Sequence, residues 1–453
     1  MAPPRDRAAD AARPLLVLAL AMSPAEQAAL ARIGGAERFR LQPFGDPAEV
    51  GDPAFCRPGR LVPALVAAAG ALPEPAAGVI AFDDYPASPL GVALAERLGL
   101  PGPRLDASLL CHHKYWSRLR QREVAPEAVP AFAPVDLARP PATPPLPFPF
   151  WLKPVKSSLS HLGFRIESAE AYAAALARAA AELPAYVAAF DELLALAPGL
   201  PPAGYPALGG RALIAEALIG GRQVTLEAFV QGGAMRLMGI TDSVCFPGHP
   251  SFSRFVYPSA LPGPVQARMA AVAGRVMAGF GFADGLFSIE FFYDEPQDRI
   301  WLIEINPRYC PQFADLYAMV DGLSSHQVMI ELACGLTPRL RPGAGRCRVA
   351  ASFVWRRFSD ATVVGAPGPD DLERLREALP DAHVDFLARP GDRLSELAQD
   401  AYSFRYAVVN IGAADAAALE SGYRRAAALL PFRFAPPGLP PAPGRSLSGR
   451  EVC

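Results

Sequence analysis

The amino-acid sequence predicts a mixed α/β and α+β protein built from more than one domain. Residues 15–100 alternate buried-strand patterns with helical patterns, which is typical of a small parallel sheet with helices on its faces. Residues 286–306 hold two runs rich in Ile, Phe, Tyr and Trp, which favour strands. Residues 346–430 again mix strand and helix patterns. A chain of 453 residues has room for about two to four domains.

Composition and charge argue against several classes of protein. The 43 basic and 45 acidic residues give a net charge of −2, which offers no support for binding nucleic acid or a membrane surface. The seven cysteines show no C-x-x-C spacing, which favours a reduced cytoplasmic protein over a disulfide scaffold. No run approaches the roughly 20 apolar residues of a membrane span. The apolar run at 14–22 precedes Ser23-Pro24-Ala25-Glu26, a capping box that favours a strand and a helix over a signal peptide.

Residues 1–106 are predicted to form the first α/β domain. Strand patterns cover 15–21, 38–44 and 78–84, and helix patterns cover 24–33, 60–70 and 89–100. No G-x-G-x-x-G follows the first strand, so no dinucleotide site is expected. Asp83 and Asp84 stand at the carboxyl end of a strand, where they either face a ligand or cap the next helix.

The segment 284–308 is predicted to form a β-hairpin. Its runs LFSIEFFY and RIWLIEIN flank the polar loop DEPQD. If Tyr293 pairs with Arg299, then Ser288 opposes Glu304, and Glu290 lies one diagonal away on the same face.

Asn306 shares this face, so two carboxylates and an amide oxygen gather beside apolar neighbours. Mg²⁺ prefers oxygen ligands of this kind. We therefore predict a metal site at Glu290, Glu304 and Asn306 rather than the alternative, a hairpin with ordinary solvated glutamates.

The pattern E-F on one strand and E-I-N-P-R on the next resembles the metal-binding hairpin of the ATP-grasp superfamily. The closest likeness is to carboxylate–amine ligases and to the biotin carboxylase and carbamoyl-phosphate synthase group. The resemblance implies that Glu290, Glu304 and Asn306 hold one or two Mg²⁺, or Mn²⁺ in their place, against the phosphates of ATP. It implies that Arg308 is a catalytic residue near the acyl-phosphate.

Two lysines match the phosphate-contacting lysines of that family. Lys153, in the motif W-L-K-P, is expected to bind ATP and to take part in catalysis. Lys114 is expected to bind ATP, and the compatible structural reading is a basic helix face of Lys114, Arg118 and Arg122. The loop 155–163 stands where the family has a glycine-rich lid, but it is rich in serine and has one glycine.

The segment A-E-A-L-I-G-G-R-Q-V-T-L-E resembles the family's hinge. On this match the backbone of Glu216, Ala217 and Leu218 meets adenine, Gln223 binds the ribose, and Glu227 points toward the triphosphate. The alternative is an exposed turn at 220–221, which explains the glycines but not the glutamates.

The resemblance implies an ATP-grasp fold with a Rossmann-like pre-ATP-grasp domain before it and a small C-terminal α+β domain after it. The expected boundaries are 1–106 for the first domain, 107–340 for the ATP-grasp domain, 341–432 for the C-terminal domain, and 433–453 for a disordered tail. The nucleotide cleft is expected between 150–218 and 219–310.

The implied function is that of an ATP-dependent ligase. Such an enzyme activates a carboxylate as an acyl-phosphate, releases ADP, and lets an amine or similar nucleophile displace phosphate. The expected partners are small-molecule carboxylate and amine substrates, without nucleic acid or membrane, and a homodimer is compatible with this reading. The serine-rich lid leaves one alternative open, a non-catalytic ATP-binding scaffold or sensor.

Overall fold

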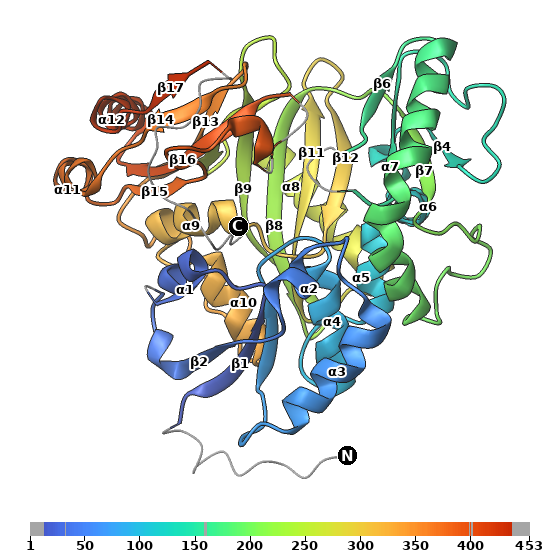
Figure 1. Ribbon diagram of the computed structural model, residues 1–453, viewed down its shortest axis with the longest axis horizontal. Helices are drawn as coiled ribbons and strands as arrows, with labels where there is room; N and C mark the ends of the chain where they lie inside the picture. Colours follow the sequence, from blue (N-terminus) through green and yellow to red (C-terminus); the bar gives the residue numbers. More distant parts are fainter. Residues whose placement is uncertain (1–12, 32, 158–160, 398, 400–401, 437–453) are drawn as a thin grey trace.

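The structure is a computed structural model that describes residues 13–31, 33–157, 161–397, 399 and 402–436. Figure 1 shows the N-terminal sheet and its helices (blue) at the base of the molecule. A second sheet and the long helix α7 (green) stand to one side, and a large sheet runs through the centre into the C-terminal elements (orange to red).

The N-terminal domain has the predicted α/β alternation. Strands β1 (Leu15–Leu20), β2 (Phe39–Pro43) and β3 (Gly78–Ala81) form a parallel sheet in the order β2-β1-β3. The helices around it are α1 (Pro24–Leu30), α2 (Pro47–Gly51), α3 (Pro58–Gly70) and α4 (Ala87–Leu98). Helix α1 begins with the predicted capping box at Ser23. The order of the sheet leaves β3 at an edge.

The next elements build a four-stranded sheet in the order β4-β7-β5-β6. Helices α5 (Leu105–His112) and α6 (Lys114–Val124) lead into it, and its strands are β4 (Phe132–Asp136), β5 (Phe150–Pro154), β6 (Phe164–Ile166) and β7 (Ala212–Ala217). Short 3-10 helices lie at Ala36–Arg38, Pro126–Ala128, Pro311–Phe313 and Leu394–Glu396.

Helix α7 (Ala169–Ala195) continues through Pro184. Its buried side chains Leu183, Val187 and Phe190 belong to the same core as the N-terminal domain, and this packing offsets the hydrogen bond that proline cannot make. Among the described residues, α7 is long and apolar enough to cross a membrane by length and composition, and 33% of its apolar window is buried. This finding corrects the prediction that no segment approaches a membrane span.

The central sheet has eight strands in the order β12-β11-β8-β9-β10-β13-β16-β15. Their bounds are β8 (Arg222–Gln231), β9 (Ala234–Cys245), β10 (Phe252–Tyr257), β11 (Gly285–Asp294), β12 (Arg299–Asn306), β13 (Val349–Arg357), β15 (His383–Phe386) and β16 (Phe404–Ala413). Helix α8 (Gly263–Gly279) shares a core with β8 and β11, in which Met269, Val276, Phe287 and Ile289 are buried. Helices α9 (Ala314–Asp321) and α10 (Ser325–Ala333) follow the hairpin.

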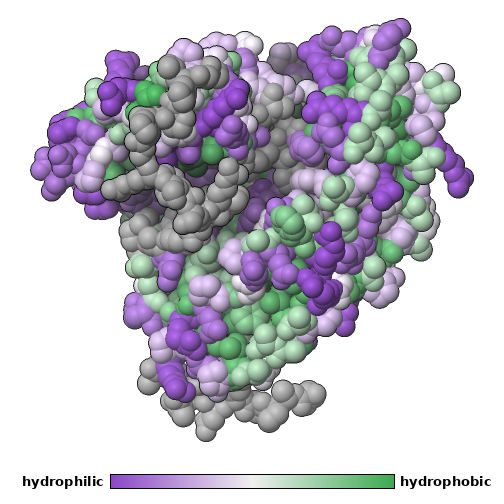
Figure 2. Space-filling model, in the orientation of Figure 1, coloured by the Kyte–Doolittle hydropathy of each residue, from purple (hydrophilic) through white to green (hydrophobic). Residues whose placement is uncertain are grey.

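Three of the C-terminal strands, β13, β16 and β15, continue this sheet. Strand β13 pairs with β10, so the predicted boundary at 340 falls between two neighbouring strands of one sheet. Helices α11 (Pro369–Ala378) and α12 (Ala416–Leu429) lie at the upper left, where hydrophilic side chains gather (Figure 2). Strand β17 (Arg433–Ala435) pairs with β14 (Thr362–Gly365), so the tail predicted from residue 433 starts with a strand. Residues 437–453 lie outside the described residues.

The predicted hairpin forms, but in a different register. Arg299 pairs with Asp294 instead of Tyr293, and a β-bulge then displaces the pairing once more. Glu290 therefore stands directly opposite Glu304, where the prediction placed it one diagonal away. The tight turn includes Asp298 at φ 47°, and the bulge adds one residue on β12, so both changes come from local geometry that strand periodicity does not encode.

We expect Gly221→Ala to destabilise the protein by about 2–3 kcal/mol. Gly221 has φ 136°, and a Cβ atom there would overlap the carbonyl oxygen of Tyr293 on β11. Gly220→Ala is the matched control, because no atom lies within 4 Å of its Cβ position. Urea denaturation measures both variants, and equal free energies of unfolding would contradict the expectation.

Candidate functional site

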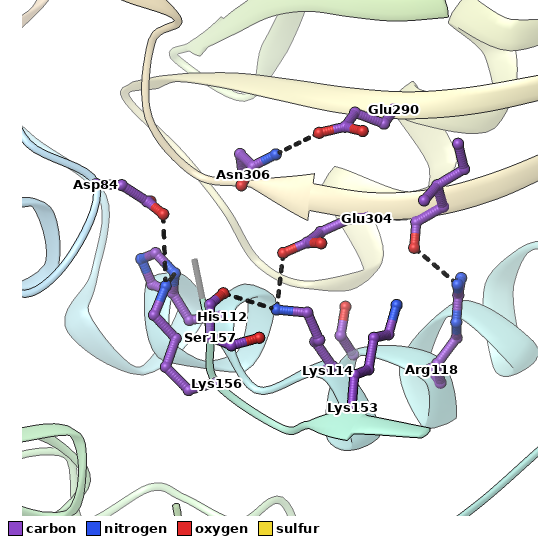
Figure 3. Close-up of polar contacts among 12 residues, drawn as sticks. Asp84, His112, Lys114, Arg118, Lys153, Lys156, Ser157, Glu290, Glu304 and Asn306 are labelled. Atoms are coloured by element: carbon purple, nitrogen blue, oxygen red, sulfur yellow. Dashed lines mark hydrogen bonds and ion pairs between the residues drawn. The ribbon is translucent and has the colours of Figure 1, made fainter. Parts of the chain in front are cut away.

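The candidate site lies where the four-stranded sheet faces the β11–β12 hairpin. A small cavity of about 10 Å³ opens between them. Its charged lining residues are Lys114, Arg118, Lys153, Glu216 and Glu304. Figure 3 shows Lys114 and Lys153 on one side of this gap and Glu304 on the other, with Glu290 and Asn306 beyond Glu304.

The hairpin brings its two carboxylates together with unequal partners. Glu304 forms an ion pair with Lys114, with 2.9 Å between Oε1 and Nζ. Glu290 accepts only amide hydrogens, from Gln223 at 3.0 Å and from Asn306 at 3.4 Å, among the contacts of the described residues. Burial, and then the charge of Glu304, raise the pKa of Glu290. Burial alone would raise the pKa of Glu304, but the charges of Lys114 and Lys153 lower it.

This donor set fits a divalent cation. Directly opposed like charges destabilise a strand pair, and a cation between the two carboxylates would remove that repulsion. The amide oxygen of Asn306 adds a third oxygen ligand on the same face. No group of three or more His, Cys, Asp or Glu side chains gathers into a metal site within the described ranges.

Lys114 is not on an exposed helix face. It is the first residue of α6, is buried, and its ammonium also donates to the carbonyl of Ser157 at 3.1 Å. Arg118, one turn later, is buried too, and only Arg122 of the predicted basic face is exposed. Lys153 on β5 forms an ion pair of 2.6 Å with Glu216.

Arg118 is a key residue whose role the sequence did not reveal. Its guanidinium binds Glu216 at 2.5 Å and donates to the carbonyls of Leu302 at 2.8 Å and Ile303 at 2.7 Å. These carbonyls lie at the bulge of β12, an edge strand, so Arg118 supplies hydrogen-bond donors to the backbone where the register shifts.

Glu216 takes part in the site through its side chain, where the prediction used its backbone. Burial opposes ionisation, but Arg118 and Lys153 lower the pKa of Glu216 to about 2. Ala217 ends β7, and Leu218 begins the connection to β8. Their predicted backbone contacts with adenine stay a prediction.

Gln223 and Glu227 both lie on β8 but have different surroundings. The amide of Gln223 is bonded to Glu290, so it lies at the candidate metal site, and its predicted ribose contact stays untested. Glu227 is fully buried under the segment after the hairpin, where the N–H of Cys310 donates to it at 2.8 Å, and its predicted direction toward the triphosphate stays a prediction. Burial raises the pKa of Glu227 to about 8, so this carboxyl group is mostly protonated at neutral pH.

A second charged cluster adjoins the first. Arg308, which follows the hairpin, donates from Nε to Asp84 at 3.1 Å. Lys156 lies 3.9 Å from Asp84 and donates to Nδ1 of His112 at 3.2 Å (Figure 3). Burial lowers the pKa of Lys156 to about 8. Of the two earlier readings for Asp84, the helix-cap reading is wrong, since α4 has no side-chain cap.

Lys156 had no predicted role, although its spacing from Lys153 could have indicated a second lysine near the site. Lys156 and Lys153 are three residues apart in K-P-V-K, at the base of the predicted lid. Two serines of the predicted lid, Ser158 and Ser160, lie outside the described residues. Burial lowers the pKa of His112 well below its ordinary value, so His112 is a neutral, buried partner of Lys156.

Comparison with known proteins agrees with the sequence motifs. Residues 146–316 match the family model described as the ATP-grasp domain. No curated protein matches the chain in a sequence search. The L-amino acid ligase from Bacillus licheniformis has a similar structure, with a TM-score of 0.72, 17% identity, and coverage of 93% of this chain and 99% of that one.

Two further solved structures are similar. Biotin carboxylase from Campylobacter jejuni has a TM-score of 0.62, 14% identity and 92% coverage of both chains. Phosphoribosylglycinamide synthetase from Anaerococcus prevotii has a TM-score of 0.61, 11% identity, and coverage of 93% of this chain and 100% of that one. The chain therefore contains an ATP-grasp domain and has the ATP-grasp fold, as the sequence predicted.

We expect Glu227→Gln to change how stability depends on pH. The pKa of Glu227 rises from 4.5 to about 8 on folding, so between these values the folded state binds the extra proton and wild-type stability falls as pH rises. The variant lacks this loss, so its free energy of unfolding rises relative to that of wild type by up to about 1.4 kcal/mol per pH unit in this window. Urea denaturation from pH 5 to 9 tests this, with exposed Glu295→Gln as control. Parallel curves for wild type and Glu227→Gln would refute it.

Proposed function

We propose that the protein is an ATP-dependent ligase that activates a small carboxylic acid and joins it to an amine. In this reaction a carboxylate oxygen attacks the γ-phosphorus of ATP, and ADP leaves. The amine nitrogen then attacks the acyl-phosphate carbon, and phosphate leaves. One observation carries the proposal: within an ATP-grasp fold, Glu304 faces Lys114 and Lys153 across a cavity, and Glu290 stands directly opposite Glu304 on the hairpin.

Glu290, Glu304 and Asn306 are the residues that would hold Mg²⁺. When bound, the ion supplies charge neutralisation and positioning for the phosphates. Of these residues, Glu290 would be stabilised most by Mg²⁺, because its carboxylate has only two hydrogen bonds among the described residues, both from amides. Glu304 would exchange or share its contact with Lys114 when the cation arrives.

Lys114 and Lys153 are placed to neutralise phosphate oxygens. Both come from the side of the cavity opposite the hairpin, and each is now bound to one glutamate. Lys153 is the less constrained, because its partner Glu216 also has Arg118. A lysine held by a carboxylate in this way is already ordered for an anionic ligand.

Arg308 is placed to bind the carboxylate substrate and its acyl-phosphate. Its guanidinium is partly exposed and donates to Asp84 from Nε and to the carbonyl of Tyr309 from Nη1. A planar guanidinium with a further donor edge suits a carboxylate or a phosphoryl group. Lys156, on the other side of Asp84, adds a second cation near this position.

We expect Lys153→Met to weaken binding of a non-hydrolysable ATP analogue with Mg²⁺ by about tenfold or more, which is about 1.4 kcal/mol. The fold should persist, because Glu216 keeps its bond to Arg118. Calorimetry measures the affinity, and exposed Arg122→Met on α6 is the control. A Lys153→Met protein that binds like wild type would show that this lysine does not meet the phosphates.

We expect Glu304→Gln to lower ADP release with a panel of carboxylic acids and amines by about a hundredfold. Nucleotide affinity should fall less, because the lysines remain. The loss falls on turnover because the charge on the transferred phosphoryl group is stabilised mainly in the transition state.

Glu295→Gln, in the exposed turn of the same hairpin, is the matched control. Unchanged ADP release in Glu304→Gln would show that the hairpin does not hold a catalytic metal. Nucleotide binding without ADP release in wild type, across the whole panel, would favour the non-catalytic binder.

A further inference from the structure

A larger cavity lies at the seam between the N-terminal domain and the ATP-grasp domain. It has a volume of about 100 Å³. One wall is the edge strand β3 and helix α4, and the other is the start of β11 and helix α10. The side chains along its length are apolar: Val79, Ala81, Val92, Ala95, Leu286 and Leu332. Because β3 is an edge strand, no neighbouring strand of its own sheet covers this side.

Polar side chains line the two ends of this cavity. Arg308 and Ser88 lie at one end, near the carboxyl end of β3, since Arg308 contacts Asp84 three residues beyond that strand. Asp284 lies at the other end, next to Pro103 and the start of β11. The cavity therefore runs from the second charged cluster of the candidate site along an apolar channel.

The channel has the size of a small organic group. From Ser88 to Ala95 helix α4 advances seven residues, or about 10 Å at 1.5 Å per residue. A volume of about 100 Å³ is several times the roughly 10–15 Å³ that one water needs. An apolar lining of this kind offers water few hydrogen bonds, so an apolar group gains by replacing it.

We propose that this cavity receives the apolar body of the carboxylic acid substrate, whose carboxylate lies at Arg308. The proposal rests on the proposed function and names its substrate class: acids that carry an aliphatic or aromatic group, in preference to small polar acids. Arg308 is the link, since it lines the cavity and also takes part in the charged cluster. Val92 and Ala95 of α4 then determine the size of group that fits.

Binding should depend on chain length. Each methylene that enters the cavity should tighten binding by about fourfold, from the usual gain for burying a methylene. Hexanoate should therefore bind more than about tenfold tighter than butyrate, and butyrate tighter than acetate. Calorimetric titration without nucleotide measures this series directly, with 3-phenylpropanoate as an aromatic probe.

Val92→Phe is the decisive variant, because the larger ring fills the cavity. It should remove the preference for hexanoate over acetate, while Val92→Ala should extend it to longer acids. Val66→Phe is the matched control: Val66 is also a partly buried valine packed on the N-terminal core, but it does not line the cavity. Thermal melts check that all three variants fold.

The outcomes separate this proposal from the ligase proposal. Chain-length-dependent binding that Val92→Phe abolishes supports the cavity, even if no acid gives ADP release. Equal affinities for acetate and hexanoate in wild type, or the same preference in Val92→Phe, overturn the cavity proposal, even if small acids do give ADP release. If Val92→Phe fails to fold, the Val92→Ala series decides, since an unchanged chain-length preference there also overturns it.

Discussion

The guanidinium of Arg118 joins the three parts of the molecule on which the candidate site depends. From helix α6 it holds the carboxylate of Glu216 on β7 and two carbonyls at the β12 bulge. Its burial leaves no water to take over these bonds, so losing it would leave a carboxylate and two backbone groups poorly satisfied. Arg118 therefore helps to fix the distance between the lysine side and the carboxylate side of the site, together with the ion pair of Lys114 and Glu304.

Around this anchor, charges of opposite sign are matched closely before any ligand arrives. Lys114 faces Glu304, Lys153 faces Glu216, and Arg308 faces Asp84. In each pair the carboxylate keeps a cationic side chain in place for an anionic ligand. The same carboxylate also competes with that ligand for the cationic side chain. Glu290 lies outside these pairs, and a cation beside it would oppose the burial and the charge of Glu304 that raise its pKa. Such an arrangement limits the reorganisation required on binding.

The sequence could predict what depends on local periodicity, and it failed where distant residues decide. Glu290, Glu304 and Asn306 share a face because side chains alternate along strands. Their register was not predicted, because the tight turn and the bulge on β12 each shift the pairing, and Arg118, which is bonded to the bulged backbone, lies 184 residues from Leu302. The cluster of Asp84, Lys156 and His112 comes from three separate parts of the chain, and no local pattern predicts that they meet. Glu227 lies on the expected strand, but the packing of the segment after the hairpin buries it.

The continuity of the eight-stranded sheet has a consequence for how the chain folds during its synthesis. Strand β10 leaves the ribosome with one edge open, and its partner β13 follows only after α8, the hairpin and two more helices. Strand β13 in turn waits for β16, so the sheet that carries the hairpin is complete only when residue 413 has emerged. Until then an unpaired edge strand is exposed to other nascent chains.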